Sequence, residues 1–186
     1  GDATALCLNL PVARSTRGGR LPRVVRPMGQ PILDLQSVDL GKAVVDDAEL
    51  RACLPHAEYF RLLDGVCHFD RERQIAVGWK DWDKNPWWAG GHVPGRPLMP
   101  GVLMIEGAAQ IATFLVKQVS GWAKEAMIGL AGLDEVRIRG MIVPPARVYF
   151  VAGGLQVSGR RLAKIHTQVF CNGAMTLETT VMGMML

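Results

Sequence analysis

Apolar and polar residues alternate over much of the C-terminal half of the chain, which predicts β-strands with one face in the core. Residues 162–171 (LAKIHTQVFC) alternate most clearly, and Asn172-Gly173 after them is a residue pair favoured in two-residue hairpin turns. Earlier in the chain, residues 60–69 and 74–82 predict two strands joined by a polar turn. After residue 121 the pattern predicts four strands, at residues 136–143, 147–157, 162–171 and 174–184.

One long helix is predicted between these two groups of strands. It begins at Pro100, which suits a first helical turn, and ends near residue 120. The segment is apolar on nearly every side, which is typical of a helix buried inside a domain. A short helix over residues 48–54, capped by Asp46 or Asp47, is also expected. One long helix among consecutive strands favours an α+β domain whose antiparallel sheet wraps around the helix.

Length and composition are those of a single globular domain, with 186 residues, 49% apolar and 20% charged. The longest apolar run, residues 102–116, is interrupted by polar residues and is shorter than the roughly 20 residues of a membrane span. No membrane association is therefore expected. The four cysteines lie far apart, without a C-x-x-C pair, so neither a disulfide scaffold nor a structural zinc site is expected. This usage favours a reducing compartment such as the cytoplasm.

The net charge of +4 resides in the first 30 residues, which hold five arginines and one acidic residue. These arginines recur at every third position among prolines and glycines, without hydrophobic periodicity. We expect residues 1–45 to form an extended N-terminal arm and residues 46–186 to form the domain. The arm is interpreted as a solvated extension; a docking strip for an acidic partner and a processed organelle-targeting segment are the alternatives. Nucleic acid is not an expected partner.

Residues 91–110 (GHVPGRPLMPGVLMIEGAAQ) combine three groups that suit the removal of a proton next to a carbonyl. His92 lies in a loop stiffened by prolines, and it is the natural base because histidine is mostly uncharged at pH 7. The loop leads into the start of the long helix. There the backbone N–H groups of Gly101 and Val102 are candidates to bind a substrate oxygen that develops negative charge. Glu106 projects from the helix surface one and a half turns later.

We predict that Glu106 is a neutral carboxylic acid at pH 7. The helix N-terminus favours its ionised form by only about 0.3–1 kcal/mol. Burial favours the neutral form by up to 3–5 pKa units, at about 1.4 kcal/mol each. Glu106 would then be a proton donor. The structural alternatives are a loop histidine without a chemical role and a glutamate paired with a basic side chain.

The same stretch resembles the β-hydroxyacyl-acyl carrier protein dehydratases of fatty acid synthesis, of the FabZ type. That family carries the pattern G-H-F-P-x-x-P-x-x-P-G-V-L-x-x-E-A-x-A-Q, and the spacing from His92 to Glu106 matches it. Residues 54–64 (LPHAEYFRLLD) and 133–139 (LDEVRIR) resemble two further family segments. The resemblance implies a hotdog fold, in which an antiparallel sheet wraps around one long central buried helix.

The resemblance also implies a mechanism. His92 would take the α-proton of a 3-hydroxyacyl thioester, and the Gly101 N–H would hold the thioester oxygen. Glu106 would protonate or orient the departing hydroxyl, with Gln110 supporting it one turn further on. The product would be a trans-2-enoyl thioester, and a glutamate in the acid position favours dehydration without isomerisation. His56, in the first of the two further segments, is interpreted as structural.

The partners implied by the resemblance are an acyl carrier protein and a second copy of the chain. The acyl group would arrive on the carrier's phosphopantetheine arm, and no metal or organic cofactor is expected. Base and acid of one site would come from different subunits, so the catalytic unit would be a homodimer, with a trimer of dimers as a further assembly.

Some residues depart from the family pattern. Val93 replaces the phenylalanine after the histidine, Pro145-Ala146 replaces the Gly-Asp of a turn, and one residue is added before His92. The acyl-length preference is therefore left open. Alternative functions are a hotdog acyl-thioester hydrolase or enoyl hydratase, and a non-catalytic module that binds acyl thioesters. Four tryptophans are interpreted as core or dimer packing rather than a tunnel gate: Trp79, Trp82, Trp87 and Trp88.

Overall fold

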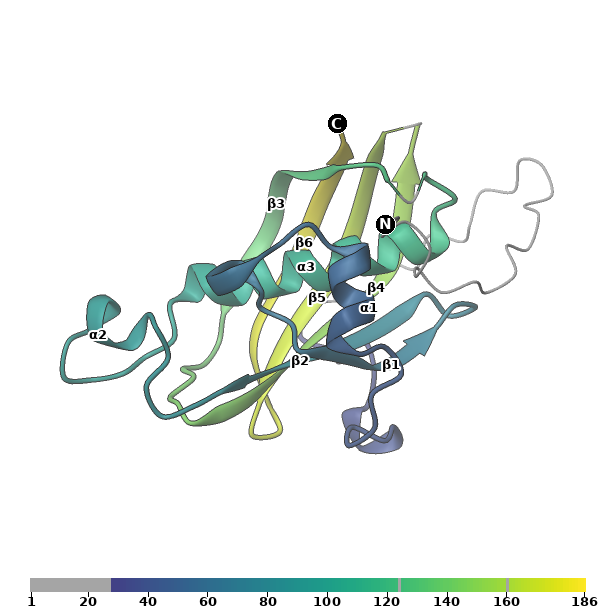
Figure 1. Ribbon diagram of the computed structural model, residues 1–186. Helices are drawn as coiled ribbons and strands as arrows, with labels where there is room; N and C mark the ends of the chain where they lie inside the picture. Colours follow the sequence, from purple (N-terminus) through teal and green to yellow (C-terminus); the bar gives the residue numbers. More distant parts are fainter. Residues whose placement is uncertain (1–27, 124, 160) are drawn as a thin grey trace.

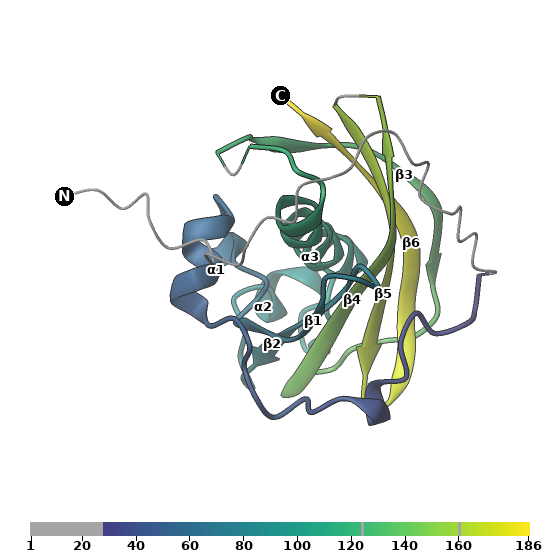
Figure 2. The ribbon, with the colours of Figure 1, turned by 90° about the vertical axis from the view of Figure 1, so that its right-hand side faces the viewer.

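A computed structural model describes residues 28–186 of the chain, apart from residues 124 and 160. Its strands form one antiparallel sheet of six, in the order β1-β2-β4-β5-β6-β3. The sheet curves around one long helix, α3, as Figures 1 and 2 show. The helices are α1 (Asp47–Cys53), α2 (Ala89–His92) and α3 (Gly101–Val119), with 3-10 turns η1 (Leu35–Ser37) and η2 (Glu58–Phe60). The strands are β1 (Gly65–Asp70), β2 (Ile75–Trp82), β3 (Ile128–Ile138), β4 (Ala146–Ser158), β5 (Leu162–Cys171) and β6 (Ala174–Met185).

The predicted central helix is confirmed as α3, which lies in the concave side of the sheet. By length and composition alone α3 could cross a membrane, but ten of its residues are buried inside the domain. Phe114, Ile111 and Leu115 have no exposed surface, and each such buried side chain contributes about 1.5–3 kcal/mol to folding. Gly107 permits close packing, because a Cβ there would lie 2.3 Å from the Phe150 ring.

The expectation that α3 is buried nearly all round is wrong on one side. Val102 is 70% exposed, and Glu106, Thr113 and Lys117 are only partly covered. The curved sheet covers the opposite side of the helix, and α1 makes only a small contact with α3. The open side begins at the end of the helix where the chemistry is expected.

Most predicted strands are confirmed, and β5 has the predicted bounds, Leu162–Cys171. The turn after it has positive φ at both Asn172 (51°) and Gly173 (76°), as a two-residue hairpin turn requires. The strand predicted over residues 136–143 is misplaced, since β3 covers Ile128–Ile138. Register shifts interrupt the pairing of β3 with β6, and β3 is exposed over most of its length, so the alternation fails there. The strand predicted over residues 60–69 begins only at Gly65.

Part of the expected arm packs on the domain, since Ile32, Leu33 and Val45 are buried. Ile32 and Leu33 are buried in a second apolar cluster on the convex face of the sheet, with Val77 and Val151 among their neighbours. Figure 2 shows this segment crossing the outside of the sheet. The part of the expected arm before residue 28 lies outside the described residues.

Candidate active site

Glu106 lies on the open side of α3, and two side chains bind one of its carboxylate oxygens. The Gln110 amide donates from Nε2 to Oε1 at 2.9 Å, and His56 Nε2 lies 3.3 Å from the same oxygen. No described residue hydrogen-bonds to the other oxygen, Oε2. The Glu106 side chain is 28% exposed, so it can be reached from outside. Glu106 therefore has one oxygen held by the protein and one available to a ligand.

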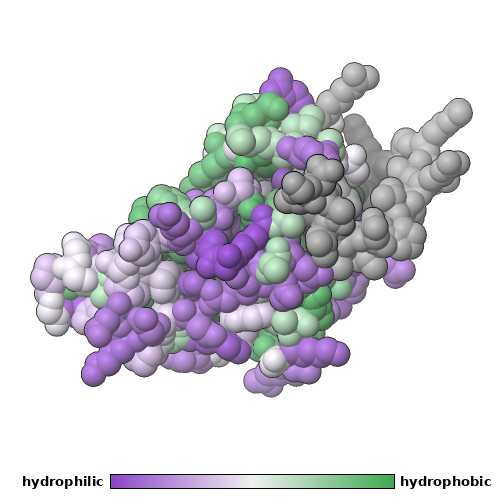
Figure 3. All heavy atoms as spheres, viewed as in Figure 1, coloured by the Kyte–Doolittle hydropathy of each residue, from purple (hydrophilic) through white to green (hydrophobic). Residues whose placement is uncertain are grey.

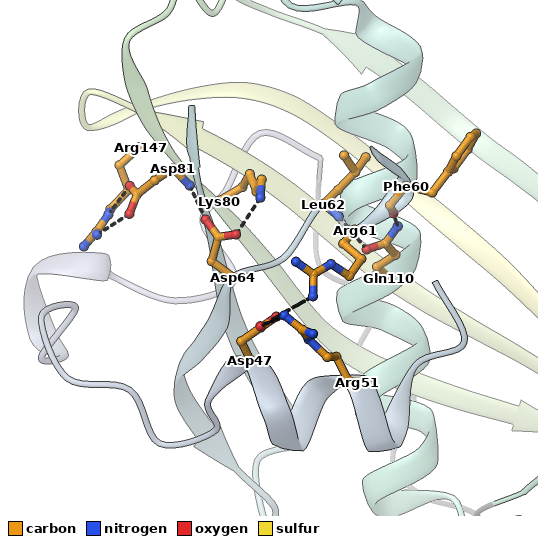
Figure 4. Close-up of polar contacts among 10 residues, drawn as sticks. All are labelled: Asp47, Arg51, Phe60, Arg61, Leu62, Asp64, Lys80, Asp81, Gln110 and Arg147. Carbon is orange, nitrogen blue, oxygen red and sulfur yellow. Dashed lines mark hydrogen bonds and ion pairs between the residues drawn. The ribbon is translucent and has the colours of Figure 1, made fainter. Parts of the chain in front are cut away.

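Gln110 fixes this arrangement to the rest of the domain. It is 1% exposed, and its Oε1 accepts the Leu62 N–H at 3.0 Å while its Nε2 donates to the Phe60 carbonyl at 2.6 Å. Figure 4 shows these contacts between α3 and the segment that leads into β1. Gln110 is expected to support Glu106, and a direct hydrogen bond joins the two side chains.

The charge state predicted for Glu106 is wrong. The hydrogen bond from His56 has the largest effect, and together with the Gln110 amide it lowers the pKa of Glu106, although burial acts in the opposite direction. Two donors on a carboxylate stabilise its charged form. Glu106 is therefore a carboxylate at neutral pH, and a role as the resting proton donor is not supported.

His56 is the site residue that sequence reasoning assigned to structure alone. It follows Pro55 after α1, fifty residues before Glu106, and is half-buried. Its contact with the carboxyl depends on how α1 and the next segment fold back onto α3. The only signal in the sequence was its place in the Leu-Pro-His segment that resembles the family pattern.

His92 lies at the end of α2, in a loop that projects beyond the start of α3 (Figure 1). The ring is exposed, and Nδ1 lies 2.8 Å from the Leu98 carbonyl. Because a carbonyl only accepts, Nδ1 carries the proton, and Nε2 of the neutral ring presents its lone pair. This is the tautomer that a base needs.

Buried tryptophans anchor the His92 loop. Trp88 is 3% exposed and meets Trp82 edge to face, with ring centroids 5.5 Å apart. The Trp88 carbonyl accepts the His92 N–H at 3.0 Å, so the ring pair is tied to the base through the backbone. Trp87 is instead 48% exposed and lies beside Tyr59. Trp82 and Trp88 thus agree with the interpretation as core packing.

The start of α3 leaves backbone donors available. The first N–H groups of a helix have no acceptor within it, and no described residue accepts from Gly101 or Val102. Ile138, at the end of β3, lies across this position, because a Cβ on Gly101 would be 2.6 Å from its Cδ1. Ile138 is itself exposed, so a flexible side chain rather than a fixed wall lies beside Gly101.

His92 and Glu106 of one chain do not meet. No hydrogen bond or ion pair joins them, since His92 contacts Leu98 and Glu106 contacts His56 and Gln110. The resemblance expects such a separation, because it takes the two groups of one site from different subunits. Within the described residues, no three His, Cys, Asp or Glu side chains come close enough to hold a metal ion.

Residues 54–180 match the family model described as "FabA-like domain". The chain belongs to this family. Two curated relatives are named 3-hydroxyacyl-[acyl-carrier-protein] dehydratase FabZ, and each is 31% identical to the chain. The protein from Rickettsia felis matches over 73% of this chain and 92% of its own length, and that from Allorhizobium ampelinum over 83% and 97%. The resemblance to FabZ-type dehydratases is confirmed.

Solved structures of other proteins share the fold of this chain. The structure titled "The Dehydratase Heterocomplex ApeI:P from Xenorhabdus doucetiae" superposes with a TM-score of 0.58 at 16% identity, covering 74% of this chain and 90% of that one. The protein Cj0977 of Campylobacter jejuni superposes with a TM-score of 0.54 at 10% identity, covering 75% and 89%. At these identities the likeness shows the fold alone, and it confirms the predicted α+β hotdog fold.

Proposed function

We propose that this protein is a 3-hydroxyacyl-[acyl carrier protein] dehydratase of fatty acid biosynthesis, a hydro-lyase that converts a 3-hydroxyacyl thioester to a trans-2-enoyl thioester and water. The observation that carries this proposal is the 31% identity to two such enzymes over more than nine-tenths of their lengths. The site supports it through a histidine with an available Nε2 and a carboxylate with an available Oε2.

The reaction begins with the thioester oxygen at the start of α3, where it accepts the unpartnered N–H groups of Gly101 and Val102. His92 Nε2 removes the α-proton, and the electrons of that C–H bond move into the enolate, whose negative oxygen these donors stabilise. This position also lies at the positive end of the helix dipole. Because Nδ1 is already bound to the Leu98 carbonyl, the ring keeps its orientation while it becomes charged.

The hydroxyl group leaves in the second half of the reaction. The 3-hydroxyl of the substrate donates a hydrogen bond to Glu106 Oε2, which places the C–O bond for cleavage. As the enolate collapses, the double bond forms and the C–O bond breaks. The leaving oxygen takes the proton that His92 gained and departs as water. Both side chains return to their starting states, so the charged form of Glu106 suits an orienting role.

A homodimer is proposed as the unit in which His92 of one subunit meets Glu106 of the other. β3 supports this, because it is an edge strand of eleven residues that pairs only with β6. Edge strands with unpaired backbone groups and apolar side chains are surfaces for pairing with another chain. Figure 3 shows apolar surface along this edge. Its exposed members are Leu130, Val136 and Ile138, with Val102 nearby at the start of α3 and Met141 and Val143 after β3.

The substrate is proposed to be carried by an acyl carrier protein, as the names of the two relatives state for those enzymes. The proposed location is the cytoplasm. The three described cysteines, Cys53, Cys67 and Cys171, support a reducing compartment because all are free thiols.

The experiment that tests the function incubates the purified protein with a 3-hydroxyacyl-[acyl carrier protein] and follows enoyl absorbance together with free thiol. We expect enoyl formation that is lost in His92→Ala and kept in His68→Gln, a matched change of a histidine on β1. Thiol release without enoyl would instead indicate an acyl-thioester hydrolase. Binding without either product would indicate an acyl-binding module.

A further inference from the structure

Both donors to Glu106 bind the same oxygen. Gln110 Nε2 and His56 Nε2 approach Oε1 at 2.9 Å and 3.3 Å, and they come from different parts of the chain. Gln110 lies on α3 one turn beyond Glu106, whereas His56 reaches it from the segment after α1. Two donors on one oxygen fix the plane of the carboxyl group, so Oε2 has a defined direction.

The surroundings of His56 indicate that its ring is a donor to Glu106 through Nε2. Nδ1 is buried and has no hydrogen-bond partner among the described residues. A proton on Nδ1 would leave a buried N–H without an acceptor, at a cost of about 1–3 kcal/mol. The proton of the neutral ring therefore belongs on Nε2, which faces the carboxylate.

Charged side chains also face His56 from the neighbouring elements. Arg51 and Asp47 of α1 and Arg61 after η2 line the same pocket as His56 and Gln110. Asp47 is bound by both arginines, so these three form a group of their own (Figure 4). None of these three residues hydrogen-bonds to Glu106. Of the described residues that line the pocket, only His56 and Gln110 contact the Glu106 carboxyl.

We propose that His56 is a positioning residue for the dehydration, which binds Glu106 Oε1 and thereby holds Oε2 toward the 3-hydroxyl of the substrate. This rests on the proposed function, since it assigns Glu106 the task of orienting that hydroxyl. His56 does not touch the substrate. It keeps the carboxylate both oriented and charged, and the lowered pKa of Glu106 agrees with that role.

The alternative is that His56 only fills space between α1 and α3. Two substitutions separate these roles. His56→Leu fills the space without a donor, whereas His56→Gln retains an N–H donor on a side chain of similar reach. A space-filling role is served by leucine as well as by glutamine, and a positioning role only by glutamine. Arg51→Ala is the matched control, because Arg51 lines the same pocket without touching Glu106.

The kinetic experiment compares kcat and KM of the four proteins with a 3-hydroxyacyl-[acyl carrier protein]. We expect His56→Leu to lower kcat by roughly 10- to 100-fold, the scale of a misplaced catalytic contact. KM changes little, because the acyl and carrier contacts remain. His56→Gln recovers most of kcat, and Arg51→Ala resembles the wild type. Equal kcat values for His56→Leu and wild type overturn the proposal.

A second measurement does not depend on activity. Protein labelled with ¹³C at the glutamate carboxyl is titrated by NMR, and the Glu106 signal is identified from its absence in Glu106→Gln. We expect its titration midpoint to lie at higher pH in His56→Leu than in wild type, with His56→Gln between them. An unchanged midpoint in His56→Leu overturns the proposal. A wild-type protein without dehydratase activity refutes the proposed function instead, and the titration still tests the His56–Glu106 contact.

Discussion

Glu106 and Glu178 are two carboxylates of the same domain. They differ in how many of their oxygens the protein binds and in how far their side chains are exposed. Glu178, on β6, has no exposed side-chain surface, and both of its oxygens are bound. Oε1 accepts the Arg139 guanidinium and Oε2 accepts the Gly29 N–H at 2.7 Å. Glu106 has both donors on one oxygen and is 28% exposed.

The pKa of each carboxyl is lowered, so the charge state alone does not separate them. For Glu178, burial opposes ionisation, but the bonds from Arg139 and the Gly29 backbone outweigh it. For Glu106 the His56 contact has the largest effect. A buried carboxylate whose two oxygens both accept hydrogen bonds from the protein has a structural role. A carboxylate with one oxygen left toward an opening is a ligand site, and that is the basis for assigning chemistry to Glu106.

The two carboxylates also secure different parts of the chain. Glu178 joins the segment before Ile32 to the end of β3, and Gln168 on the neighbouring strand accepts the Ile32 N–H at 2.8 Å. These bonds fasten residues 29–32 across the convex face of the sheet. Glu106 instead joins α3 to the segment after α1 on the concave side. We therefore expect changes at Glu178 to affect stability and changes at Glu106 to affect turnover.

The largest expected effect is on activity, in Glu106→Gln. The amide is nearly isosteric but carries no charge, so it accepts the substrate hydroxyl more weakly and no longer stabilises it during C–O cleavage. We expect kcat/KM to fall roughly 100-fold or more. The free energy of unfolding, from urea denaturation, should change by less than about 1 kcal/mol because the side chain is partly exposed. Wild-type activity in this variant contradicts the assignment of Glu106.

Glu178→Gln is expected to give the opposite result. It removes the charge that Arg139 binds, and a buried hydrogen bond to a charged group contributes about 1.5–3 kcal/mol. The free energy of unfolding should fall by about that amount, while kcat of the folded protein stays that of the wild type. Glu72→Gln, in the exposed turn between β1 and β2, is the matched control and should change neither quantity. A loss of kcat in Glu178→Gln at full folding would mean that the two regions are coupled.

The sequence predicts the helix that carries the candidate site better than it predicts the charge state of the side chains on that helix. The mostly apolar pattern of residues 102–116 predicts α3, and Pro100 marks its start, so Gly101 lies in the first turn, as observed. The charge of Glu106 was mispredicted because its dominant partner, His56, is distant in sequence and pairs only after folding. The prediction weighs burial against the helix N-terminus alone, and local spacing gives no sign of a long-range donor.

The segment before α1 was missed for a different reason. Ile32 and Leu33 lie in residues 31–42, where apolar and polar positions mix without a clear period. Their burial comes from a shallow site on the sheet, where a Cβ on Gly153 would lie 2.7 Å from Ile32. The residues that bind the backbone of this segment, Gln168 and Glu178, lie more than a hundred positions away. Such tertiary contacts are not encoded in local pattern.

Acidification should remove the contribution of Glu178 to stability only below the pH at which exposed glutamates become protonated. The pKa of Glu178 is lower in the folded protein than in the unfolded chain, where glutamate titrates near about 4.3. Its contribution to stability is therefore complete above that pH and is lost as the pH falls through the folded value. Urea denaturation at pH 7, 4 and 3 should show a smaller loss of stability on acidification in Glu178→Gln than in wild type. Parallel curves for the two proteins would contradict this.

The smallest expected effect on stability is at Asp46, an exposed carboxylate, in contrast to the buried Glu178 and the partly buried Glu106. Its side chain accepts the Glu49 N–H at 2.9 Å, and the Glu49 side chain accepts the Asp46 N–H at 3.0 Å, so the two form a capping box at the start of α1. Asp46→Ala should lower the free energy of unfolding by about 1 kcal/mol, the usual contribution of such a cap. Because α1 carries the chain toward His56, kcat should be measured as well. An unchanged kcat would show that α1 tolerates a frayed first turn, whereas a decrease comparable to that of His56→Leu would show that the position of His56 depends on this cap.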